Sequence, residues 1–252
     1  MILGDALCAL GALLLCPVMA LADASAPAGT TAWPDTFVAR LEALALLQSL
    51  NADLLSHDSA TATLERWCAV HRLASPPRIV AERVTLDKEP TPEQRRELDV
   101  SPTESVRYRR VRLMCGALAL SEADNWYVPG RLTPEMNRLL DTSDVPFGKA
   151  VQALHFQRHI LSSTLLWRPL PDGWELGEHP RGGCAAALDV PSRLLEHRAL
   201  LALPDGTPIS EVVETYTDKV LAFPVAQPDT ASACSSSASA DIGAPQVVPV
   251  HR

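Results

Sequence analysis

A strand-like segment carrying four arginines constrains this chain more than any other feature. It runs from Ser105 to Cys115 and reads SVRYRRVRLMC. Arginine is an unusual residue for a strand of a small domain unless acidic side chains or an anionic ligand lie beside it. A later segment, Pro208 to Tyr216, reads PISEVVETY and carries two glutamates. Together the two segments predict a pocket that holds an arginine and a carboxylic acid, and such a pocket suits a small carboxylate ligand.

Helical patterns come first along the chain, and strand patterns follow. Apolar residues at helical spacing (Phe37, Leu41, Leu44 and Leu47) predict a helix from Trp33-Pro34 to about residue 51. A second helix is expected from about 58–61 to 70, and shorter helices from Thr91-Pro92, Thr133-Pro134 and 145–149. Strands are expected over 78–84, 106–114, 118–122 with 126–128, 152–165, 195–203 and 208–217, with 170–190 as a loop.

The last two strands are joined by Pro204-Asp205-Gly206-Thr207, and Asp-Gly between apolar runs is typical of a β-hairpin. Helices followed by hairpins predict an α+β domain, built on an antiparallel β-sheet with helices packed on one face.

Both ends of the 252-residue chain differ in composition from a folded core. Residues 6–22 are apolar, and they end in Ala20-Leu21-Ala22, a pattern that precedes signal-peptide cleavage. The run is short for a membrane span. One feature disagrees with a signal peptide, because the residues before the run carry Asp5 and no positive charge, whereas a signal peptide normally starts with positive charge. We therefore expect a signal peptide at 1–22 and a periplasmic or secreted protein with no stable membrane anchor after cleavage. The alternatives are an uncleaved anchor or a misassigned start codon, which would make the protein cytoplasmic.

The remaining boundaries follow from the same reasoning. A linker is expected at 23–32 and a single domain at 33–223, which is long enough for a sizeable core. Residues 224–252 are rich in Pro, Ala and Ser without periodicity, and they predict a disordered tail.

Charge and cysteine content exclude several classes of function. The net charge of −8 argues against nucleic acid as a partner. Outside the apolar N-terminal run the cysteines are Cys68, Cys115, Cys184 and Cys234, which show no C-x-x-C pair and no zinc spacing. They could form a disulfide in an oxidising compartment, but ordinary buried thiols are the favoured interpretation. No metal site and no cofactor are expected.

Five short motifs, in one order over about residues 50–220, resemble the chorismate pyruvate-lyase family. They are Leu54-Leu55-x-x-Asp58-Ser59-x-Thr61, the arginine strand ending in Cys115, Asn125-Trp126-Tyr127-Val128-Pro129-Gly130-Arg131, Val145-Pro146-Phe147-Gly148-Lys149, and Gly206-Thr207-Pro208 before the acidic strand. The resemblance implies a chorismate lyase-like fold, which is shared with ligand-sensing UTRA domains of bacterial transcription factors. Because one fold hosts several functions, it does not decide the chemistry.

The resemblance also implies a reaction and a set of site residues. The family eliminates pyruvate from chorismate and leaves 4-hydroxybenzoate, without a metal or an organic cofactor. An arginine that holds a carboxylate falls on Arg110, with Arg112 as the next choice, and backbone contacts fall on Ala60 and Phe147. Arg131 is a further candidate for the pocket. Structural ion pairs with nearby glutamates are the alternative for these arginines.

The position of the catalytic glutamate depends on a detail of the last strand. It falls on Glu214 if that strand has a one-residue bulge. Without a bulge the matching position is Val213, and Glu211 is the nearest acid on the same face, because side chains alternate along a strand.

Two functions therefore remain open. In one, the protein is a lyase that acts on chorismate. In the other, it is a noncatalytic periplasmic module that binds a small aromatic or cyclic carboxylate. A signal peptide favours the second, because chorismate is made and consumed in the cytoplasm, whereas the arginine and the glutamate favour the first. The sequence does not predict an oligomeric state.

Overall fold

The computed structural model describes residues 33–178 and 187–223. The chain divides into residues 1–30 and 31–252, and the first unit lies outside the described residues. The expected signal peptide, linker and tail, together with Cys184 and Cys234, also lie outside them. Among the helices of the described part, none combines the length and apolar character that a membrane span requires.

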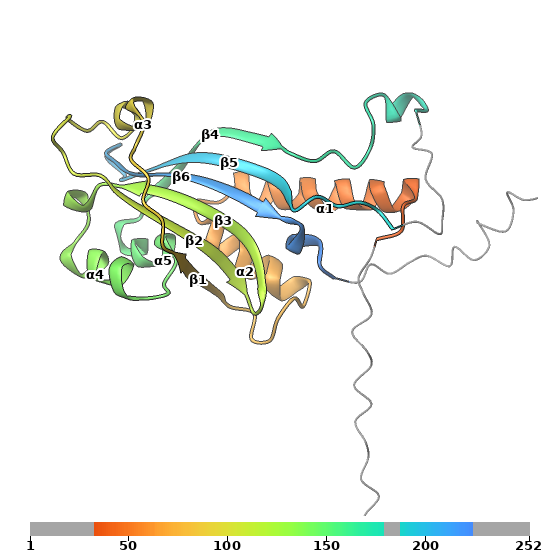
Figure 1. The fold of residues 1–252 in the computed structure, drawn as a ribbon, viewed down its shortest axis with the longest axis horizontal. Coiled ribbons are helices and arrows are strands. Elements are labelled where there is room, and N and C mark those ends of the chain that lie inside the picture. Colours follow the sequence, from red (N-terminus) through yellow and green to blue (C-terminus); the bar gives the residue numbers. More distant parts are fainter. Residues whose placement is uncertain (1–32, 179–186, 224–252) are drawn as a thin grey trace, which may run out of the picture. The chain divides into compact units, whose positions relative to one another are not determined.

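A six-stranded antiparallel sheet forms the centre of the described domain, with the order β1-β2-β3-β6-β5-β4 (Figure 1). Each strand is antiparallel to its neighbours. This confirms the predicted α+β class with an antiparallel sheet. The strands are β1 (Ile79–Val84), β2 (Arg107–Cys115), β3 (Leu118–Tyr127), β4 (Gln157–Leu165), β5 (Arg193–Ala202) and β6 (Pro208–Thr217).

Five α-helices and four short 3₁₀ helices accompany the sheet in the described residues. The α-helices are α1 (Phe37–Leu55), α2 (Ala60–Val70), α3 (Pro92–Glu97), α4 (Pro134–Thr142) and α5 (Phe147–Ala150). The 3₁₀ helices are η1 (Pro129–Arg131), η2 (Gln152–Leu154), η3 (Trp174–Leu176) and η4 (Asp218–Leu221).

The two faces of the sheet differ in what covers them. We call the face covered by α1 and α2 the inner face; both helices lie behind the sheet in Figure 1. The larger hydrophobic core lies between these helices and the sheet. The opposite, outer face carries a small cluster of Leu98, Trp126 and Val128 beside the short helix α3.

Local sequence signals explain where the helices begin. The Thr36 side chain caps α1 by accepting from the Ala39 amide, and Ser59 caps α2 by accepting from the Ala62 amide. Thr91 and Gln94 form a capping box at the start of α3, the helix predicted from Thr91-Pro92. Of the four apolar residues that predicted α1, Leu47 alone belongs to its buried stripe, which consists of Ala39, Ala43, Leu47, Leu50 and Leu54.

Two expectations about the fold were wrong. Residues 152–165 are not one strand, because 152–154 form η2 and β4 begins only at Gln157. Cys68 and Cys115 are not ordinary thiols, because they form a disulfide that joins α2 to the end of β2. Both cysteines are fully buried, since α2 packs across this end of the strand.

Candidate functional site

A cavity opens on the inner face between the sheet and the starts of α2 and α5. Its polar walls are Arg109, Asn125, Arg158 and Glu214 from four different strands, together with Asp58, Ser59 and Thr61 around the start of α2. Its apolar walls include Val111, Leu113, Ala123, Phe147, Phe156, Leu201 and Val212. Strand register explains the gathering, because cross-strand partners such as Arg109 and Asn125, or Asn125 and Val212, point to the same face. The cavity volume is about 40 Å³, which is room for a few water molecules.

Arg109 is the least compensated charge of this cavity. The residue is 8% exposed, and its Nη2 donates to the Val145 carbonyl at 3.0 Å. Its buried Nε has no hydrogen-bond partner, and no carboxylate of the described residues lies within ion-pair distance of it. Burial, together with the nearby charge of Arg83, lowers the pKa of Arg109 to about 10, so the side chain remains charged at neutral pH.

Arg158 and Glu214 form a buried ion pair in the same cavity. The distance between Arg158 Nη2 and Glu214 Oε2 is 2.5 Å, and the two side chains are 3% and 7% exposed. Burial opposes the charge of Arg158, but the attraction of Glu214 outweighs it and raises the pKa of the guanidinium. The Nε of Arg158 is buried without a hydrogen-bond partner, so this arginine is also incompletely satisfied within the described chain.

Tyr216 and His197 are the polar neighbours of Glu214 on β6 and β5. The Tyr216 hydroxyl donates to Glu214 Oε2 at 3.1 Å, and burial raises the pKa of this tyrosine well above its usual value. His197 is the cross-strand partner of Glu214, and its Nε2 lies 2.7 Å from Asn51 Oδ1. Burial lowers the pKa of His197 to about 4, so its ring is neutral at physiological pH. The carboxylate therefore lies between a charged arginine and neutral polar groups.

Three of the residues chosen from the sequence line this cavity: Ala60, Phe147 and Glu214. The structure also has the one-residue bulge in the last strand on which the choice of Glu214 depended. Leu201 pairs with Ser210 and Ala202 with Pro208, so β6 has one extra residue, Ile209, opposite β5. Whether these three residues contact a ligand stays a prediction.

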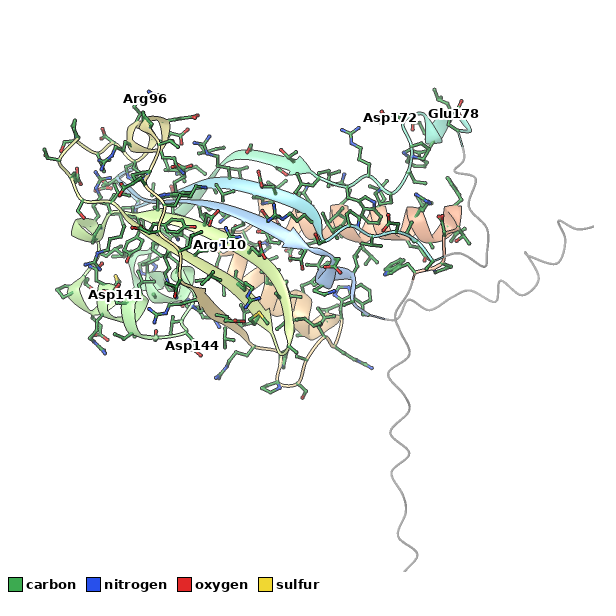
Figure 2. The ribbon with its side chains drawn as sticks, viewed as in Figure 1. Arg96, Arg110, Asp141, Asp144, Asp172 and Glu178 are labelled. Carbon is green, nitrogen blue, oxygen red and sulfur yellow. A yellow bond between two sulfur atoms is a disulfide. The ribbon has the colours of Figure 1, made fainter. Side chains whose placement is uncertain are left out.

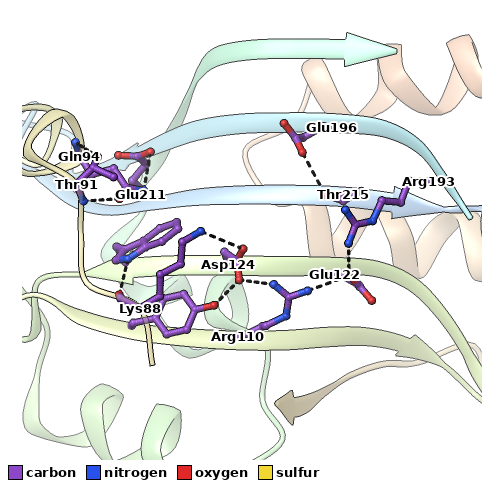
Figure 3. A network of polar contacts seen from close by, with 12 residues as sticks. Lys88, Thr91, Gln94, Arg110, Glu122, Asp124, Arg193, Glu196, Glu211 and Thr215 are labelled. Atoms are coloured by element: carbon purple, nitrogen blue, oxygen red, sulfur yellow. Dashed lines mark hydrogen bonds and ion pairs between the residues drawn. The ribbon is translucent and has the colours of Figure 1, made fainter. Parts of the chain in front are cut away.

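Arg110 and Arg112 do not belong to the cavity, and the expectation that Arg110 and Glu214 converge was wrong. Successive side chains of β2 alternate between the faces, and Arg110 lies on the outer face opposite Asp124. Figure 2 labels Arg110 on this sheet, and Figure 3 shows its pairs with Asp124 and Glu122, at 2.8 and 3.0 Å. Arg112, the second choice from the sequence, pairs with Glu82 at the surface and not with the alternative acid Glu211, whose ion-pair partner is Arg198.

Glu211 and Arg131 also have structural partners outside the cavity. Glu211 is fully buried on the outer face, where Arg198 Nε lies 2.7 Å from its Oε1 and Gln94 of α3 donates to the same oxygen. The Arg131 guanidinium donates to the carbonyls of Leu98, Asp99 and Pro208 and to Glu104. It therefore joins the end of α3 to the start of β6, and it does not line the inner-face cavity.

The residue pattern around Arg109 could have identified it as a residue of the inner face, whereas no comparable pattern surrounds Arg158. Alternation along the strand separates Arg107 and Arg109 from Arg110 and Arg112, but it does not indicate which pair faces the helices. Val111, Leu113 and Cys115 are apolar and occupy every second position after Arg109, so they lie on the same face of the strand as Arg109. Their apolar character identifies that face as the inner one. Arg158 lies in β4, an edge strand with mostly polar, exposed residues, and the sequence has no motif there.

Comparisons with known proteins add a fold-level likeness and one close relative. No protein-family model matches the chain. A crystal structure of PhnF from Mycobacterium smegmatis is similar with a TM-score of 0.41 and 11% identity, covering 69% of this chain and 70% of that one. The possible transcriptional regulator YydK from Bacillus subtilis is similar with a TM-score of 0.34 and 16% identity, covering 60% of this chain. The match spans 62% of YydK, and at such TM-scores neither likeness carries an argument about function.

The close relative is the uncharacterized protein y4mC of Sinorhizobium fredii. It is 54% identical over 194 residues, which are 76% of this chain and 82% of that protein. Identity at this level over most of both proteins shows common membership, so the chain belongs to the family of the uncharacterized protein y4mC.

Proposed function

We propose that the inner-face cavity binds a small carboxylate and that the ligand carboxylate pairs with Arg109. The observation that carries this proposal is the buried guanidinium of Arg109, which has no carboxylate partner among the described residues. A buried cation without an anion is costly, and a bound carboxylate would remove that cost. A guanidinium also suits this role because it can donate to both carboxylate oxygens.

The charges and walls of the cavity favour a monoanionic, otherwise apolar ligand head. Arg109 and Arg158 each contribute a formal positive charge, and Glu214 and Asp58 each a formal negative one. Because Arg158 is already paired with Glu214, Arg109 is the cation left for one ligand carboxylate. The remaining walls are largely aliphatic and aromatic, as is usual for small-molecule sites. Both properties agree with the aromatic or cyclic carboxylate that the family resemblance implies.

A second candidate function is the elimination of pyruvate from chorismate. It is favoured by the presence of Glu214 in the same cavity as Arg109, since the reaction of the resembling family uses an arginine and a glutamate together. In this proposal Arg109 takes the role expected for Arg110. Glu214 moves a proton near the ring hydroxyl, and it must first release the ion pair with Arg158.

We place binding before catalysis because of the proposed compartment. The Cys68–Cys115 disulfide supports an oxidising compartment, and the apolar run at residues 6–22 supports export. An exported protein would not meet chorismate in the cytoplasm.

One set of measurements separates these functions. The purified full chain is titrated with 4-hydroxybenzoate by calorimetry, alongside Arg109→Leu and the matched control Arg110→Leu. We expect Arg109→Leu to weaken binding by about 2–5 kcal/mol and the control to leave it nearly unchanged. Equal affinities of both variants and the wild type would contradict the proposal.

Chorismate is then added, and the release of 4-hydroxybenzoate is followed by absorbance. Binding of 4-hydroxybenzoate without turnover supports the binding module. Turnover that Glu214→Gln abolishes, while binding persists, supports the lyase.

A further inference from the structure

The cavity around Arg109 is much smaller than most ligand sites, and a second space lies directly beside it. Its volume of about 40 Å³ falls well below the roughly 300–1,000 Å³ of typical small-molecule pockets. A neighbouring cleft has a volume of about 460 Å³, which lies within that range. We call the first space the head cavity and the second the outer cleft.

The two spaces share one wall, which four residues form: Asp58, Ser59, Gly148 and Phe156. These residues come from the start of α2, from α5 and from the loop before β4. The outer cleft is further lined by Ala62, Glu65, Lys149, Gln152 and His155. A molecule that enters the head cavity from the outer cleft therefore passes the shared wall.

Gly148 is the member of this wall that carries no side chain. A Cβ atom at Gly148 would lie 3.5 Å from Ser59 Oγ, 3.7 Å from Phe156 Cζ and 3.8 Å from Thr61 Oγ1. These are ordinary contact distances, so a methyl group would just fit and a larger side chain would press against these neighbours. The absence of a side chain at this position therefore leaves the wall between the two spaces thin.

The outer cleft has little free positive charge to offer. Lys149 Nζ lies 2.5 Å from Glu65 Oε1, and Asp58 Oδ1 accepts from the Arg158 backbone amide at 3.0 Å. The two carboxylates outnumber the single lysine, so a second anionic group is disfavoured there. Gln152 and His155 offer hydrogen-bonding groups, which suit amide or hydroxyl groups of a ligand.

We propose that the ligand is an elongated monocarboxylate, with its carboxylate in the head cavity and a neutral, hydrogen-bonding body in the outer cleft. Gly148 is then a specificity-determining position, because it admits the part of the ligand that crosses the shared wall. This inference rests on the proposed function and goes beyond it, since it names the substrate class and a second subsite.

Three probes test the inference on the purified full chain by calorimetry or NMR titration. Acetate supplies only a head. Hippurate supplies a head with an amide and a ring. Its analogue with a second carboxylate on the ring supplies an anionic body. We expect hippurate to bind at least about tenfold more tightly than acetate, and the dicarboxylate to lose that advantage.

Gly148→Leu is the decisive variant, and Gly130→Leu is its control. A Cβ at Gly130 meets nothing within 4 Å, and this glycine lies outside both spaces. Gly148→Leu should abolish the advantage of hippurate over acetate, whereas Gly130→Leu should preserve that advantage. If Gly148→Leu does not fold, Gln152→Ala with His155→Ala should reduce the advantage instead.

The outcomes separate this inference from the proposed function. If acetate and hippurate bind equally, and both depend on Arg109, the outer subsite is wrong and the carboxylate site stands. If neither probe binds in an Arg109-dependent way, both proposals fall. If Gly148→Leu weakens the binding of acetate and of hippurate equally, Gly148 is not a specificity-determining position.

Discussion

The Arg158 guanidinium reaches Glu214 across an intervening strand, because β5 lies between β4 and β6. The two side chains are both buried, and their 2.5 Å contact joins the edge strand to the centre of the sheet. The pair is thus a stabilising contact and a wall of the head cavity at once. A ligand that recruits either group must compete with the other.

Replacing one partner of this ion pair should destabilise the fold more than replacing both partners. Arg158→Met leaves the Glu214 charge buried with the Tyr216 hydroxyl as its one remaining side-chain donor in the described part of the chain, and should lower the free energy of unfolding by about 3–5 kcal/mol. The double variant Arg158→Met/Glu214→Leu should recover much of that loss. Urea unfolding of the three proteins measures both effects. A double variant as unstable as the single one would show that the pair itself stabilises the sheet.

Arg109 should destabilise the ligand-free protein. Its charge is buried without a carboxylate partner among the described residues, so Arg109→Met should raise the free energy of unfolding by about 1–4 kcal/mol, while it weakens carboxylate binding. Thermal unfolding without and with 4-hydroxybenzoate checks both effects. Arg112→Met is the matched control on the same strand: this side chain is 44% exposed, and the change should stay within about 0.5 kcal/mol. Destabilisation by Arg109→Met would mean that its bond to Val145 outweighs the cost of burial.

His197 should make the domain less stable in mild acid. Its folded-state pKa of about 4 lies below the usual 6.5, so the unfolded chain binds the proton first as the pH falls. The contribution is complete above about pH 6.5 and is lost as the pH falls through about 4. Its full size is on the order of 3 kcal/mol. The groups around the ring are Asn51, Ser163, Glu214, Arg158 and Tyr216.

The measurement is urea unfolding over this pH range for the wild type and His197→Gln. The variant keeps a donor toward Asn51 but has no titrating ring, so its stability should fall less steeply with acidity. Parallel curves for the two proteins would show that carboxylates cause the whole acid dependence.

Local signals were sufficient to predict most of the fold. Thr-Pro starts at 91 and 133, the Asp205-Gly206 hairpin and the alternation of β2 each act within a few residues, so the sequence displays them directly. The start of β4 was misplaced because polar, exposed edge strands lack the alternation that marks a half-buried strand. The disulfide was missed because it depends on how α2 crosses β2, and no spacing in the sequence encodes that crossing.

The site was predicted only in part, and for a related reason. Alternation divided the arginines of β2 into two pairs correctly, but a motif match then selected Arg110 from the outer pair. The inner face was readable from Val111 and Leu113, which share the parity of Arg109. Arg158 could not be found this way, because its partner Glu214 is 56 residues away and two strands apart.

The Cys68–Cys115 disulfide should contribute strongly to stability and hold the site together. It closes a loop with a sequence separation of 47, for which the loss of unfolded-state entropy corresponds to about 4 kcal/mol. It also joins α2, whose first residues line the head cavity, to the strand that carries Arg109. The double variant Cys68→Ala/Cys115→Ala should therefore unfold at a lower urea concentration and bind carboxylates more weakly. Reductant should shift the unfolding of the wild type toward that of the double variant and leave the double variant unchanged. A wild type that is insensitive to reductant even after unfolding and refolding in its presence would show that α2 is held by packing alone.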